Sequence, residues 1–114
     1  MNNYKYKDKA NTVSGFIQTL TEENSAVANG FTAMHKATFE PGALDVKQKE
    51  LIALGIAITI HCEGCIACHI QSVLKSGATK EEIVETIGVA ILMGGGPSIV
   101  YGNIAYNAMK EMME

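Results

Sequence analysis

The feature that most constrains the fold is an uncharged apolar run from Leu51 to Ile60, with the sequence LIALGIAITI. The run is only about half of the ~20 residues that span a membrane, so it predicts a buried helix and no membrane partner. A reversal of the chain near His61 and Cys62 would bring a second helix back along the first. We therefore expect two antiparallel helices in the middle of the chain.

Four chemically active side chains surround this expected bend: Glu50 before the run, and Cys62, Cys65 and His69 after it. At about 100° per residue, the two cysteines and His69 share a helical stripe about 60° wide. Cys65 and His69 lie one turn apart. At about 1.5 Å per residue, Glu50 and His69 reach similar heights on facing helices. We expect the carboxylate to hydrogen-bond the imidazole, directly or through water, and to raise its basicity.

These groups fit redox chemistry at a dithiol, which needs a thiolate, a proton acceptor and a second sulfur that closes a disulfide. On a regular helix the Cβ atoms of Cys62 and Cys65 would lie about 5–6 Å apart. A disulfide prefers about 3.5–4.5 Å, so closing it would require some distortion of the helix. Free N–H groups at the helix N-terminus favour a thiolate at either cysteine and do not choose between them.

Other interpretations of these residues stay open. The cysteines could be inert core residues, since cysteine is commonly buried. Together with Cys68 and His69 they could bind zinc, but four ligands on two turns of one helix cannot easily surround an ion unless it bridges two subunits. Cys68 could resolve the same thiol as Cys62, although its place inside the helix favours a spectator. His61 could stabilise the thiolate by its charge or could be a partly exposed turn residue.

Helical patterns cover most of the remaining chain. We expect helices over residues 8–20, 22–39, 46–60, 62–76, 79–93 and 97–112. Asp45 with Gln48 and Thr79 with Glu82 have the spacing of capping boxes, and Gly77 suits the end of a helix. The first two helices are expected to place two sets of apolar residues each on one face: Val13, Phe16, Ile17 and Leu20, then Val27, Phe31, Met34 and Phe39.

Composition narrows the class of protein. The chain has 114 residues, 47% of them hydrophobic, with no Trp and only two Pro, which favours a compact helical protein with one domain over residues 1–114. The formal net charge of −3 and the scattered basic residues predict no nucleic-acid partner. The start, MNNYKYKDKANTV, has no apolar signal core, and the three cysteines are crowded together, so we expect a cytoplasmic protein.

The spacing of Glu50, eleven residues, Cys62, two residues, Cys65, three residues and His69 resembles the motif of AhpD-like (alkylhydroperoxidase D-like) proteins in the carboxymuconolactone decarboxylase family. The resemblance covers Glu50 to Gly77. It implies an all-α bundle of about six helices that reduces hydroperoxides or disulfides without a bound organic cofactor. It assigns Cys65 as the thiol that attacks the peroxide, Cys62 as the resolving thiol, and His69 with Glu50 as the proton relay. It also implies an external dithiol reductant and a homo-oligomer, a trimer or hexamer.

One position departs from this pattern. Well-studied alkylhydroperoxidases carry a second histidine directly before the second cysteine, where this chain has Gly64. Family members that decarboxylate a lactone lack the cysteine pair, so this chain looks unlike them. Two alternatives to a peroxidase remain: a non-redox enzyme with His69 and Glu50 as its acid–base pair, and a non-catalytic redox-sensing or assembly protein.

Overall fold

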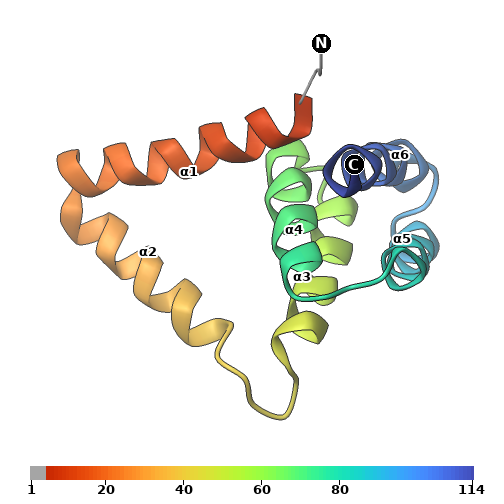
Figure 1. Ribbon diagram of the computed structural model, residues 1–114, viewed down its shortest axis with the longest axis horizontal. Coiled ribbons are helices and arrows are strands. Elements are labelled where there is room, and N and C mark those ends of the chain that lie inside the picture. Colours follow the sequence, from red (N-terminus) through yellow and green to blue (C-terminus); the bar gives the residue numbers. More distant parts are fainter. Residues whose placement is uncertain (1–4) are drawn as a thin grey trace.

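The computed structural model describes residues 5–114, which form six helices and no strand (Figure 1). The helices are α1 Lys5–Glu23, α2 Ser25–Thr38, α3 Val46–Thr59, α4 Glu63–Lys75, α5 Lys80–Gly94 and α6 Gly96–Met113. The all-α class and the expected number of helices are confirmed. The first four residues of the polar N-terminal segment lie outside the described residues. Among the described helices, none combines the length and the apolar character that a membrane span requires.

The starts of α3 and α5 are each fixed by a pair of local hydrogen bonds. The Asp45 carboxylate accepts from the Gln48 N–H at 2.7 Å, and the Gln48 side chain accepts from the Asp45 N–H at 2.9 Å. Thr79 and Glu82 form the same reciprocal pair at the start of α5. Gly77, with a φ of 89°, follows the C-cap of α4 in the left-handed conformation that favours glycine. Both predicted capping boxes and the predicted glycine stop are therefore present.

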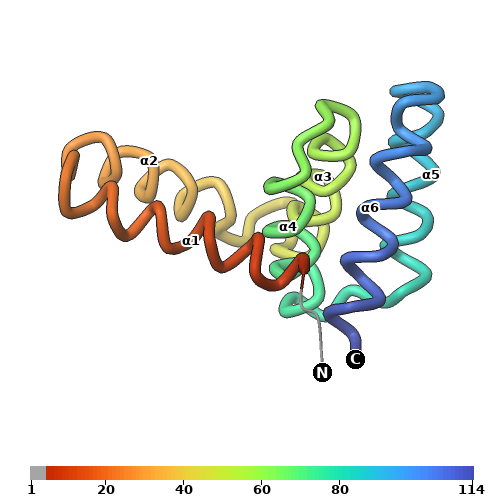
Figure 2. Tube along the Cα trace, turned by 90° about the horizontal axis from the view of Figure 1, so that it is seen from above, coloured from red at the N-terminus to blue at the C-terminus, as the bar shows by residue number. Residues whose placement is uncertain are grey.

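Helices α3 to α6 form the body of the molecule. Helix α3 packs against α4 and α5, and α6 packs against all three (Figure 2). The core between them is built from aliphatic side chains that are fully buried, the largest being Leu54, Ile58, Ile66, Ile70, Ile83 and Met109. Burying one such side chain contributes about 1.5–3 kcal/mol. The body thus gives α3 and α4, which carry the predicted site, a rigid support.

Helices α1 and α2 form a hairpin, here called the arm, that projects from the body (Figures 1 and 2). The arm is attached at the start of α1, where Tyr6 and Ala10 are buried and the Glu111 carboxylate accepts from the N–H groups of Tyr6 and Lys7 at 3.0 and 2.8 Å. The first helix continues to Glu23, beyond the predicted end at residue 20.

The apolar faces predicted for the first two helices exist, but most of their residues do not pack into the body. Five of their residues are exposed: Val13, Phe16, Val27, Phe31 and Met34, with between 40% and 63% of each residue's surface accessible. From residue 11 to residue 39, Ala28 is the one buried residue. The helical period placed these side chains on one face of each helix, but the period does not say what that face meets.

Candidate functional site

The chain reverses between α3 and α4 through a tight helix-ending turn at His61. The N–H of His61 donates to the Ile58 carbonyl at 3.2 Å, and the N–H of Cys62 donates to the Ala57 carbonyl at 3.1 Å. This is the Schellman pattern, which needs a left-handed residue after the C-cap. Here that residue is His61, with a φ of 62°, where glycine is usual. Its exposed ring stacks on Tyr101 of α6, with centroids 4.6 Å apart and planes 14° apart.

Cys62 is the N-cap of α4 and does not belong to the helix, which corrects the predicted start at residue 62. Its backbone is extended (φ −104°, ψ 96°), and its Sγ accepts a hydrogen bond from the Cys65 N–H at 3.2 Å. A disulfide joins Cys62 and Cys65, whose Cα atoms are 5.2 Å apart, within the usual range for such bonds. The expected distortion of the helix is avoided because one of the two cysteines lies outside it.

Glu50 and His69 meet between α3 and α4. The Nδ1 atom of His69 lies 2.8 Å from Oε1 of Glu50, the direct contact expected from their heights on the two helices. Glu50 is buried, with 5% of its surface accessible, whereas His69 is partly exposed. An ionised carboxylate can only accept, so this hydrogen bond places the imidazole proton on Nδ1 and leaves the lone pair of a neutral ring on Nε2. That nitrogen is then free to accept a proton.

A row of rings leads from the arm to His69, and sequence analysis did not find it. Phe31, His35 and Phe39 follow one another at four-residue spacing, with centroids 6.1 Å apart in the first pair and 4.8 Å in the second. The ring of Phe39 lies 6.2 Å from that of His69. The sequence did contain a signal for this row, since aromatic residues four positions apart lie on the same side of a helix. No role was predicted for His35 from the sequence, and the structure places its ring between those of two phenylalanines.

The two remaining positions of interest lie on α4. Cys68 is a free, half-buried cysteine, and burial raises the pKa of its thiol.

At Gly64, an added Cβ would lie 3.6 Å from Cγ2 of Val13, so α1 covers this position. That distance is an ordinary van der Waals contact, so the packing at this position does not explain the departure noted in the sequence. Within residues 5–114, no group of three or more His, Cys, Asp or Glu side chains is arranged to hold a metal ion.

The sequence of the chain is similar to those of known proteins. A sequence profile described as the carboxymuconolactone decarboxylase family matches residues 25–107. An uncharacterized protein of the cox locus of Paracoccus denitrificans is 35% identical over 99 residues, which cover 87% of this chain and 89% of that protein.

Two solved structures each resemble more than nine tenths of the chain. Apo-lpg0406, a carboxymuconolactone decarboxylase family protein from Legionella pneumophila, has a TM-score of 0.94 and 37% sequence identity, covering 98% of this chain and 100% of that one. A second family protein, from Thermotoga maritima, has a TM-score of 0.83 and 28% identity, covering 92% and 90% of the two chains. The Thermotoga protein is described as "possibly involved in antioxidative response".

Proposed function

The chain belongs to the carboxymuconolactone decarboxylase family, and from this premise we propose that it reduces hydroperoxides with Cys62 and Cys65 as its redox couple. The observation that carries the proposal is the pairing of these two cysteines at the start of the helix that also bears His69. The hydrogen bond from His69 to Glu50 supports it, because it holds a proton-accepting nitrogen on the same helix. The description of the Thermotoga relative points in the same direction.

In the proposed cycle, the protein starts with both cysteines reduced. Nε2 of His69 accepts the proton of the Cys65 thiol, and the thiolate attacks one peroxide oxygen. The O–O bond breaks, the departing alkoxide takes the proton from His69 and leaves as an alcohol, and Cys65 becomes a sulfenic acid. The thiol of Cys62 then attacks that sulfur, water leaves, and the disulfide forms. The peroxide has gained the two electrons that the dithiol has lost.

An external dithiol closes the cycle by thiol–disulfide exchange with the Cys62–Cys65 bridge. A cytoplasmic location fits this proposal, because a reducing compartment supplies such dithiols. The same exchange would let the protein reduce a small disulfide in place of a peroxide.

The test is a peroxidase assay with a panel of hydroperoxides and a dithiol reductant. We expect Cys65→Ser to abolish turnover, and Cys62→Ser to leave a sulfenic acid at Cys65 that mass spectrometry detects. Cys68→Ser is the matched control and should keep its activity. The mechanism is wrong if both Cys65→Ser and Cys62→Ser keep full peroxidase activity.

The same assay separates the alternatives. A catalytic activity that survives alkylation of all thiols would indicate a non-redox enzyme based on His69 and Glu50. Reversible formation of the disulfide without turnover by any reductant would indicate a redox sensor.

A further inference from the structure

His61 adopts a backbone conformation that is costly for a residue with a side chain. Its φ of 62° lies in the left-handed region, where glycine is the usual residue because a Cβ crowds the following carbonyl oxygen. Strain of this kind persists only where the surrounding structure holds it in place. A glycine would make the backbone hydrogen bonds of the turn equally well. The imidazole of His61 therefore needs a contact of its own that offsets this cost.

That contact is the stack of the His61 ring on Tyr101. The ring planes are 14° apart, and the distance of 4.6 Å between the centroids is at the short end of the range for aromatic pairs. His61 is exposed, whereas Tyr101 is partly buried and packs against the hydrophobic core. Beside Tyr101, α6 approaches α5 so closely that a Cβ added at Gly102 would lie 2.9 Å from Cγ2 of Ile87. Tyr101 is thus a firm support for the His61 ring.

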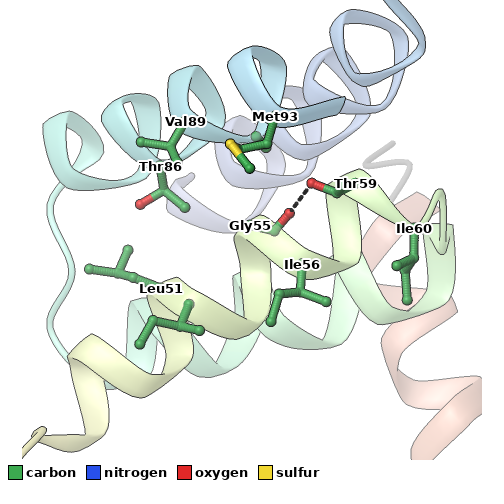
Figure 3. A pocket seen from close by; sticks show the side chains of 10 residues that line it. Leu51, Gly55, Ile56, Thr59, Ile60, Thr86, Val89 and Met93 are labelled. Carbon is green, nitrogen blue, oxygen red and sulfur yellow. Dashed lines mark hydrogen bonds between the residues drawn. The ribbon is translucent and has the colours of Figure 1, made fainter. Parts of the chain in front are cut away.

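The stack holds the turn that joins α3 to α4. On the α3 side, the N–H of the C-cap residue Ile60 donates to the Ile56 carbonyl at 2.9 Å, and both residues line the groove between α3 and α5 (Figure 3). On the α4 side, Cys62 follows His61 directly, and its Sγ accepts from the Cys65 N–H. A movement of the His61 backbone therefore moves the sulfur of Cys62 relative to Cys65.

The stack matters more in the reduced protein than in the oxidised one. In the oxidised protein, the bond between Cys62 and Cys65 itself restrains the turn. In the reduced protein that bond is absent, and only the hydrogen bonds of the turn and the stack keep Cys62 near Cys65. Without the stack, the reduced turn gains conformational freedom that closure of the disulfide has to remove. The stack therefore favours the disulfide.

We propose that His61 is a positioning residue, whose stack on Tyr101 stabilises the Cys62–Cys65 disulfide relative to the dithiol. It touches none of the reacting atoms and acts through the backbone that it shares with Cys62. The coupling is reciprocal, so closure of the disulfide strengthens the stack by the same factor. The proposal rests on the redox couple of the proposed function and on none of its peroxide chemistry.

The test is a redox titration of the full-length chain in glutathione buffers. As the bridge forms, oxidised glutathione takes up the two electrons and two protons of the dithiol and becomes two molecules of glutathione. Alkylation and mass spectrometry measure the fraction of the Cys62–Cys65 bridge. We expect Tyr101→Leu to lower the equilibrium constant for disulfide formation about 2–10-fold, the factor that one aromatic pair supplies. Tyr101→Phe keeps a ring under His61 and should keep the wild-type constant.

His61→Asn tests the other partner of the stack. Asparagine tolerates the left-handed conformation but has no ring, and the exposed turn can accept it without disturbing the core. We expect the same decrease, and no further decrease when Tyr101→Leu is added. Tyr106→Leu is the matched control, because Tyr106 is also partly buried on α6 and packs against the same core. It should keep the wild-type constant, whatever its effect on the melting temperature.

Four results would each overturn the proposal. They are a wild-type constant in Tyr101→Leu or in His61→Asn, an equal decrease in Tyr106→Leu, an equal decrease in Tyr101→Phe, and a double variant in which the two decreases multiply. Peroxidase turnover is a separate question, because the titration contains no peroxide. A protein without peroxidase activity would defeat the proposed function and leave the coupling between the stack and the disulfide standing.

Discussion

His69 donates a hydrogen bond from Nδ1 to Oε1 of Glu50 over 2.8 Å, although 19 positions of sequence separate the two residues. The acceptor comes from the first turns of α3 and the donor from the middle of α4, so the contact depends on the antiparallel packing of these helices. It fixes the orientation of the imidazole and leaves Nε2 available. In the proposed cycle, Glu50 acts through His69 and does not touch the reacting atoms.

Replacing Glu50 by glutamine should lower peroxidase turnover by about 10–100-fold, the size of the effect when a metal-binding histidine loses the group that orients it. The amide has the same shape, but it carries no charge to stabilise the imidazolium that forms when His69 accepts a proton. Steady-state rates with a hydroperoxide and a dithiol measure the effect. Glu85→Gln, on the exposed face of α5, is the control and should keep wild-type turnover. Equal rates for Glu50→Gln and the wild type would remove Glu50 from the mechanism.

The contact between Glu50 and His69 was predictable because it depends only on two helix periods and one reversal of the chain. The position of Cys62 was harder to predict. The spacing alone puts it on the helix, whereas the structure makes it the N-cap, since His61 takes a left-handed conformation that its residue type does not signal. The pairing of the two cysteines follows from that local turn.

The arm shows a different limit of sequence analysis. The residues of α1 and α2 have the apolar period of packed helices, and the structure leaves those faces exposed. Periodicity identifies a face that is stable when covered, but the covering surface can belong to another molecule. The contact between the rings of Phe39 and His69 could not be predicted from the sequence either. It joins the end of α2 to α4 and depends on how these two helices pack.

The pH dependence of labelling should distinguish Cys68 from the redox pair in the reduced protein. Burial raises the pKa of the Cys68 thiol, so its thiolate forms only at a pH above that of an ordinary cysteine, about 8.5. At neutral pH we expect iodoacetamide to label Cys65 before Cys68, with mass spectrometry following each site. In urea the labelling of Cys68 should shift to lower pH. Faster labelling of Cys68 than of Cys65 in the folded protein would contradict this expectation.

Glu82 should make the stability of the protein depend on pH in the acid range. The hydrogen bond from the Thr79 N–H, followed by the Lys47 ammonium at 2.9 Å, lowers the pKa of Glu82 in the folded state. A lowered pKa stabilises the fold fully above the unfolded value of about 4.3, and this stabilisation is lost as the pH falls through the folded value. Glu82→Gln should therefore melt below the wild type at neutral pH, and the two melting temperatures should converge in acid. A difference that persists at about pH 2 would contradict this assignment.

Two glycines of α5 should respond to alanine in opposite directions. At Gly94, an added Cβ would overlap Oγ of Ser98 and lie 3.1 Å from its Cβ, and Ser98 is fully buried. Overpacking of this kind costs about 1–3 kcal/mol, so Gly94→Ala should lower the melting temperature measured by circular dichroism. At Gly88, an added Cβ would meet no atom within 4 Å beyond the adjacent residues and the backbone of its own helix, so alanine should stabilise the helix by about 0.5–1 kcal/mol. Gly88→Ala is thus the matched control, and a shift of both variants in the same direction would show that the close packing of α5 against Ser98 is misplaced.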